Sequence, residues 1–201
     1  MEVTGEVEVK DGHVTGAARG IRVGHVFRRS DDKRVVQAGP GRLLFSWMQP
    51  YDSWERFLDE FYVWWNHFQR LARPEVLDTV SVRFINRIDV PQDAIEIKDY
   101  LRTAIDVSPY LPQILSGYYL QMAVPLNAPG VTTQIISTIV PTAPTQGTSL
   151  ILDIESSDTR RLSLTDGDPG ERLSASLDQL RTHKNYVFEA CITDATRRLI
   201  D

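Results

Sequence analysis

The sequence predicts an α+β fold, in which a curved antiparallel sheet packs against two long helices in a helix-grip-like two-layer architecture. Segments that alternate apolar and polar residues are separated by clusters of Gly, Pro, Asp and Ser, a pattern typical of hairpin-linked strands. Two longer segments instead repeat their apolar residues at helical spacing, which is typical of amphipathic helices. With 201 residues, the chain is expected to form a single domain over residues 1–201.

Short strands are expected in the first third of the chain. The alternating segments are 3–9, 21–28, 34–39 and 42–48, and the polar turn 30–33 links two of them into a hairpin. Residues 10–20 are rich in small side chains and predict no definite element. This part of the chain is therefore predicted to be rich in β structure.

The first long helix is predicted to begin with a capping box. Asp52 can accept hydrogen bonds from the early helical amides, Glu55 can reach back to it, and Pro74 ends the helix. The apolar stripe consists of Trp54, Phe57, Leu58, Phe61, Trp65, Phe68 and Ala72. An aromatic stripe at helical spacing is typical of a core that packs on a sheet. Tyr62 and Trp64 flank the stripe and are the candidates for an exposed rim.

A strand over 79–90 follows the helix and has one apolar face. That face consists of Val80, Val82, Phe84, Ile88 and Val90, and Asn86 shares it. Arg83 and Arg87 lie on the other face, which must be partly polar. Helical turns are expected at 93–103 and 109–117, and strands at 118–126, 132–140 and 148–156. This order predicts an antiparallel meander.

The C-terminal helix is predicted to begin with a second capping box, with Asp168 as the N-cap, Pro169 at the first helical position and Glu171 at the third. Its buried stripe consists of Leu173, Leu177, Leu180, Phe188, Cys191 and Ala195. Lys184 falls in the middle of that stripe. The helical pattern lasts to about residue 199, so the sequence predicts either one unusually long helix or a break near 192–194.

Composition predicts a folded, soluble protein. The chain is 42% hydrophobic and 24% charged, which is close to globular averages. It has no apolar run long enough to span a membrane, and its first residues lack the pattern of a signal peptide, so a cytoplasmic protein without membrane contact is expected. A net charge of −5 argues against a wholly basic nucleic-acid binder.

Motifs for metal or nucleotide chemistry are absent from the sequence. The four histidines lack metal-ligand spacing, Cys191 stands alone, and neither a phosphate-binding glycine loop nor a nucleophile elbow occurs. Asp89, Glu96 and Lys98 resemble a nuclease set, but 93–96 is equally a capping box. The sequence therefore assigns no catalytic residue, no cofactor and no metal ion.

A polar network is predicted around the apolar stripe of the C-terminal helix. An unpaired buried ammonium costs several kcal/mol, so Lys184 is expected to reach Asp153 or Glu155 on the strand 148–156. Arg83 or Arg87 would complete this network. Asn86, if buried, also requires hydrogen-bond partners. The network is either internal scaffolding or the lining of a polar ligand pocket.

Seven blocks of the sequence resemble a known family. These blocks are KRVVQAG (33–39), FSWMQPYDSWE (45–55), RFINRIDVP (83–91), DYLRT (99–103), LPQILSGY (111–118), LILDIE (150–155) and LRTHKNYVFEACITDATR (180–197). They resemble, in order, a sporadically distributed, uncharacterised prokaryotic protein family defined by a single profile named for its patchy occurrence. The resemblance implies that residues 1–19 are a shortened or divergent N-terminal strand region.

The resemblance implies a cytoplasmic accessory protein of bacteria or archaea. Patchy occurrence fits mobile loci, including antiviral defence or toxin–antitoxin-like gene pairs. The resemblance implies no activity, so it transfers no catalytic residue to this chain.

The sequence favours a non-enzymatic protein-interaction module that binds another protein. Its partner-binding rim would include Arg28, Arg29, Tyr62 and Trp64. One alternative is a small-molecule-binding sensor or enzyme with a pocket between the sheet and the C-terminal helix. Another is a nucleic-acid-binding module that uses arginine patches such as the basic segment 19–34.

Overall fold

The structure is a computed structural model that describes residues 2–10, 13–21, 24–31, 33–126, 128–140 and 147–200, with the backbone alone for 2–21. The chain forms two compact units, Met1–Pro74 and Glu75–Asp201. Whether they act as one domain over 1–201 stays a prediction.

The first unit contains two separate antiparallel β structures. β1 (Glu2–Lys10) pairs with β2 (His13–Ile21), and β2 occupies most of the segment for which the sequence predicted no definite element. β3 (His25–Arg28), β4 (Arg34–Gly39) and β5 (Arg42–Trp47) form a second sheet in that order. The turn between β4 and β5 uses Gly41 at φ 68°, a conformation that favours glycine. The strands 34–39 and 42–47 confirm the sequence prediction almost residue for residue.

Helix α1 (Trp54–Ala72) belongs to the first unit. Its N-cap is Ser53, whose hydroxyl accepts a hydrogen bond from the Arg56 amide at 3.2 Å. The predicted cap at Asp52 is wrong by one residue, and the Asp52 carboxylate pairs with the Arg56 side chain instead. Arg73 ends the helix in the left-handed conformation, one residue before Pro74. The aromatic stripe packs on the small sheet, where the Phe57 and Phe45 ring centroids lie 5.0 Å apart.

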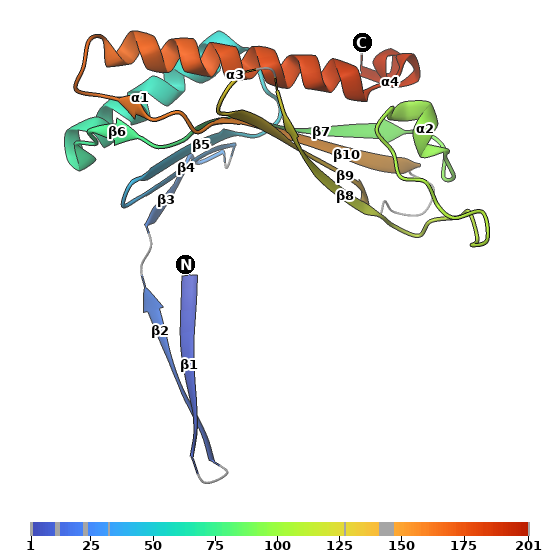
Figure 1. Cartoon of the computed structure of the whole chain (residues 1–201), viewed down its shortest axis with the longest axis horizontal. Helices are drawn as coiled ribbons and strands as arrows, with labels where there is room; N and C mark the ends of the chain where they lie inside the picture. Colours follow the sequence, from blue (N-terminus) through green and yellow to red (C-terminus); the bar gives the residue numbers. More distant parts are fainter. Residues whose placement is uncertain are drawn as a thin grey trace. The chain divides into compact units, whose positions relative to one another are not determined.

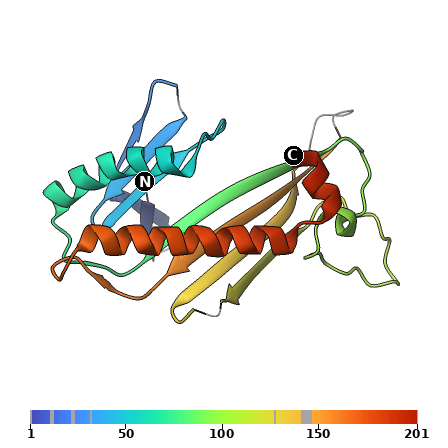
Figure 2. The ribbon, with the colours of Figure 1, turned by 90° about the horizontal axis from the view of Figure 1, so that it is seen from above.

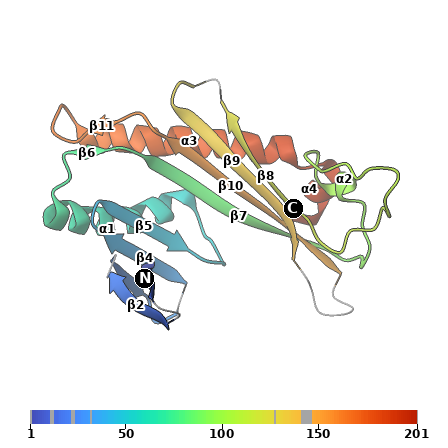
Figure 3. The same ribbon diagram turned by 60° about the horizontal axis from the view of Figure 1, so that its bottom comes forward.

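The second unit is built on a four-stranded antiparallel sheet. The strand order is β7 (Val80–Val90), β10 (Thr148–Asp158), β9 (Val131–Val140) and β8 (Tyr119–Pro125), as Figure 3 shows. β8, β9 and β10 form the predicted meander, and β7 pairs with β10 at the far side. A short pair, β6 (Val76–Leu77) with β11 (Leu162–Ser163), was not predicted.

Three helices complete the second unit. α2 spans Ile97–Tyr100, α3 spans Pro169–Cys191 and α4 spans Asp194–Ile200. The Asp168 carboxylate caps α3 by accepting from the Glu171 amide at 3.0 Å, as predicted. The helical pattern breaks between α3 and α4, which confirms the second of the two predicted possibilities. The helical turn predicted over 109–117 is wrong, because these residues form turns and bends.

The main core lies between α3 and the four-stranded sheet. α3 runs along β7 and β10 on one face of that sheet, as Figures 1 and 2 show. The most deeply buried core side chains are Ile88, Leu101, Leu150, Leu152, Ile154 and Leu180. On β10, the residues Leu150, Leu152 and Ile154 alternate with side chains on the opposite face.

The chain therefore has an α+β fold with antiparallel sheets. The helix-grip arrangement, with both long helices on one curved sheet, is not confirmed. The strands form separate ladders, α1 packs on β5, and α3 packs on β7 and β10. In the described part of the chain, no helix is both long enough and apolar enough to cross a membrane.

Candidate functional site

The face of the four-stranded sheet opposite α3 contains one strong ion pair. Arg83 on β7 donates from Nε to the Asp153 carboxylate on β10 at 2.9 Å, and a second guanidinium nitrogen completes a bidentate contact. This hydrogen bond raises the pKa of the Arg83 guanidinium. Glu155 lies directly opposite Arg83 in the strand register and adds a favourable charge interaction. Three of the predicted network residues are thus brought together.

Arg87 forms a second polar group on the same face. Its guanidinium donates to Asp89 at 2.8 Å and to the Ser149 hydroxyl at 3.1 Å, and Ser149 in turn donates to Asp89. The hydrogen bonds from Ser149 and then from Arg87 lower the pKa of the Asp89 carboxyl. These three side chains satisfy one another, so the group is typical of a structural cross-strand contact.

Asn86 and Lys184 lie on the opposite side of the sheet, facing α3. The Asn86 amide donates to the Leu152 carbonyl at 2.9 Å, which supplies one of the partners that a half-buried amide requires. The Lys184 ammonium lies 3.7 Å from the centroid of the Phe84 ring. Burial, and then the charge of Arg181, lower the pKa of Lys184 to about 8.

The prediction that Lys184 contacts the carboxylate of Asp153 or Glu155 is wrong. Asp153 and Glu155 occupy the positions of β10 that alternate with its core residues, so the strand itself separates them from the buried ammonium. Among the described residues, Lys184 contacts an aromatic ring rather than an acid. The six predicted residues therefore lie on the two faces of the sheet and do not converge on one pocket.

The predicted rim residues lie in the first unit and do not form one surface of equal exposure. Arg28 ends the exposed strand β3, and Arg29 approaches Asp31 at 3.9 Å. Tyr62 is half-buried, and its hydroxyl has no hydrogen-bond partner among the described residues. Trp64 is half-buried and stacks on Phe27, with ring centroids 5.8 Å apart.

The residues of the nuclease-like spacing do not converge. Asp89 binds Arg87 and Ser149, Glu96 caps α2, and Lys98 pairs with Asp106. Within the described ranges, no three His, Cys, Asp or Glu side chains are placed to hold a metal ion.

Sequence reasoning missed an exposed apolar turn that precedes β8. Tyr110, Leu111 and Ile114 are 95%, 59% and 90% exposed, whereas Leu115 and Tyr118 pack against the main core. We call residues 108–114 the display turn. Its shape is held by its own hydrogen bonds, because the Gln113 amide donates to the carbonyls of Ser108 at 3.0 Å and Leu111 at 2.8 Å.

The display turn continues into an unpaired sheet edge. β8 pairs only with β9 among the described strands, and its side chains alternate between exposed and half-buried. The signal that could have revealed this surface is an absence of charge, because the sequence contains no Asp, Glu, Lys, Arg or His between Asp106 and Asp153. Exposed edge strands usually carry charges that prevent pairing with another chain.

An apolar groove lies in the first unit, between the small sheet and the C-terminal half of α1. Its volume is about 600 Å³. The sheet contributes His25, Phe27, Val36, Ala38 and Leu43. The helix contributes Trp64, His67, Phe68 and Leu71. The groove belongs to α1 rather than to the C-terminal helix, where the sequence placed a pocket.

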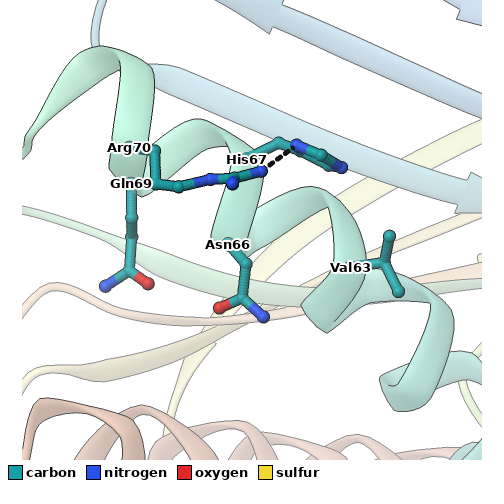
Figure 4. Close-up of a pocket in the computed structure, with 5 residues that line it drawn as sticks. All are labelled: Val63, Asn66, His67, Gln69 and Arg70. Carbon is teal, nitrogen blue, oxygen red and sulfur yellow. Dashed lines mark hydrogen bonds between the residues drawn. The ribbon is translucent and has the colours of Figure 1, made fainter.

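A shallow polar concavity of about 720 Å³ adjoins this groove on α1. It is lined by Val63, Asn66, His67, Gln69 and Arg70 (Figure 4). The Arg70 side chain extends along the helix to His67, while Asn66 and Gln69 point away from this pair. The Arg70 guanidinium lies 2.6 Å from Nδ1 of His67.

Comparison with known proteins gives no relative from which a role can be inferred: no family model, no curated protein and no solved structure matches the chain. The resemblance to the sporadically distributed family therefore stays a prediction.

Proposed function

We propose that the chain is a protein-interaction module whose partner docks on the display turn and the neighbouring edge of β8. The observation that carries this proposal is the exposure of Tyr110, Leu111 and Ile114 on a turn that its own hydrogen bonds hold in place. Binding of an ordered turn loses little conformational entropy. Aromatic and large apolar side chains of this kind are typical anchors at protein interfaces.

The edge of β8 favours a protein over other classes of partner. Within the described residues no strand pairs with this edge, so its backbone N–H and C=O groups can pair with a strand of another chain, which gives affinity through main-chain hydrogen bonds. A nucleic acid requires cations, and this segment has none between Asp106 and Asp153. Anionic lipid headgroups make the same demand. A place in a prokaryotic accessory or defence locus is proposed from the resemblance alone.

The experiment is an affinity purification with matched baits. Wild type, Tyr110→Glu, Ile114→Glu and Ala123→Lys are compared in an extract of the source organism, with Tyr186→Glu on α3 as the control because Tyr186 is also well exposed. We expect one protein to be retained by wild type and by the control but lost by the other three variants. Recombinant partner should then bind wild type about tenfold or more tightly than Ile114→Glu. Equal recovery by all baits, or binding of wild type to lipid vesicles instead, would contradict the proposal.

A further inference from the structure

The groove in the first unit is open because the sheet presents a small side chain, Ala38, beside the second half of α1. Near the start of the helix, Phe57 packs on Phe45, with ring centroids 5.0 Å apart. Further along the helix, His25, Ala38 and Leu43 lie side by side across the three strands. The middle residue of this row is Ala38, whose methyl group leaves space beneath the helix. The cavity of about 600 Å³ that results is within the range of small-molecule sites.

The walls of the groove are apolar, aromatic and partly in contact with solvent. Phe27 stacks on both Trp64 and His25, with centroids 5.8 Å and 6.1 Å away. Phe27 is 47% exposed and Leu71 is 86% exposed. Burial of this surface by an apolar ligand contributes roughly 25 cal/mol per Å². The body of a ligand that fits the groove is therefore aliphatic or aromatic.

The polar end of the groove contains the hydrogen bond between Arg70 and His67, in which the donor and the acceptor can be assigned. An arginine guanidinium has donors and no acceptor, so Nδ1 of His67 must accept from Arg70. The proton of the neutral imidazole then lies on Nε2, which is a donor. His67 lines both the groove and the polar concavity. A ligand head group at this end meets a hydrogen-bond donor beside the fixed positive charge of Arg70.

We propose that this groove binds a small amphipathic carboxylate, whose aliphatic or aromatic body lies along Phe27 and Trp64 and whose carboxylate accepts from Nε2 of His67. A carboxylate is favoured over a neutral alcohol because a hydrogen bond to an ionised acceptor is about twice as strong as one between two neutral groups. The groove belongs to the first compact unit and the display turn to the second, so this proposal goes beyond the proposed protein interaction.

The test uses the full chain and calorimetric titration with two probes, sodium decanoate and sodium 2-naphthoate, which separate an aliphatic from an aromatic body. Decanol and decyltrimethylammonium serve as probes with a neutral and a cationic head. We expect one of the two carboxylates to bind with a Kd below about 1 mM, and the matched decyl alcohol or cation to bind about tenfold more weakly.

Variants then locate the site. Ala38→Phe fills the groove and should abolish carboxylate binding, and Leu71→Asp should weaken it about tenfold through repulsion at the exposed mouth. His67→Phe keeps the ring and removes the donor, so it should weaken carboxylate binding about tenfold and leave decanol binding within about twofold. Asp59→Ala is the control, since Asp59 is exposed on α1 and lines neither the groove nor the polar concavity.

Thermal unfolding of each variant shows whether it is folded at the titration temperature. The proposal is overturned if wild type binds neither carboxylate, or if folded Ala38→Phe and Leu71→Asp both bind as wild type does. Neither result bears on the display turn, whose variants are tested with a different partner.

Discussion

Arg83 on β7 and Asp153 on β10 are joined by a bidentate ion pair, although they are separated by 70 positions in the sequence. The two partners differ in exposure, since the Arg83 side chain is 51% exposed and that of Asp153 is 9% exposed. Loss of the arginine leaves a buried carboxylate without its main partner. Loss of the acid leaves a cation that water can solvate.

Arg83→Met is therefore expected to lower the free energy of unfolding by about 2 kcal/mol. Urea denaturation at neutral pH measures this change. Arg87→Met is the matched control, because Arg87 and Asp89 are both more than half exposed, and its expected effect is below about 1 kcal/mol. Equal losses in the two variants would contradict the assigned role of burial.

The buried ammonium of Lys184 is expected to lower the free energy of unfolding at neutral pH. Its pKa of about 8, against 10.5 for an ordinary lysine, corresponds to a penalty of about 3 kcal/mol on the charged form. The contact with Phe84 offsets about 1 to 2 kcal/mol of it. Lys184→Met should therefore raise the free energy of unfolding at pH 7 by about 1 to 2 kcal/mol.

The pH dependence has a definite sign. Between pH 8 and 10.5 the unfolded state holds more protons on this lysine than the folded state does, so the wild-type free energy of unfolding rises with pH in that window. Lys184→Met should lack this rise. Parallel profiles of wild type and variant in urea denaturation from pH 7 to pH 10 would count against the assignment.

Gly147 is expected to be the most sensitive glycine in the second unit. Its φ is 75°, and a Cβ at this position would lie 2.1 Å from the Val90 carbonyl oxygen. Gly147→Ala combines backbone strain with a clash against backbone and should lower the free energy of unfolding by more than about 3 kcal/mol.

Gly41 is the control for that substitution. It also has a positive φ, of 68°, but a Cβ there would meet nothing within 4 Å. Gly41→Ala should cost only about 1 kcal/mol. Similar midpoints for the two alanine variants in thermal unfolding would exclude the close approach at Gly147.

Cys191 is expected to be unreactive in the folded protein. Burial raises the pKa of its thiol, and the side chain lies in the main core on the last turn of α3. Labelling with a disulfide reagent at pH 8 should be slower in buffer than in denaturing urea by about a hundredfold or more. Rapid labelling in buffer would show that the end of α3 leaves the sheet.

Much of the local structure could be predicted because it depends on neighbouring residues. The Asp168 cap and the strands at 34–39 and 42–47 follow from short-range patterns, and the break after α3 is one of the two outcomes that the helical pattern left open. The division of the strands into separate sheets could not be predicted in this way. The pairing of β7 with β10 joins segments that are distant in the sequence, and no periodicity specifies it.

The candidate site was predicted less well, for a physical reason that the sequence does contain. Leu150, Leu152 and Ile154 alternate with Asp153 and Glu155, so a helix that packs on the leucines faces away from the acids. The groove depends instead on the distance between α1 and its sheet beside Ala38, which local pattern does not specify.

The position of β10 has a consequence for synthesis on the ribosome. β10 lies between β7 and β9, and its last residue, Asp158, pairs with Val80 at the start of β7. A nascent chain that has emerged only as far as β9 can form the β8–β9 hairpin, while the inner edge of β7 still has no strand beside it. The sheet can therefore be completed only after β10 has emerged, and until then the inner edge of β7 is exposed to pairing with other chains.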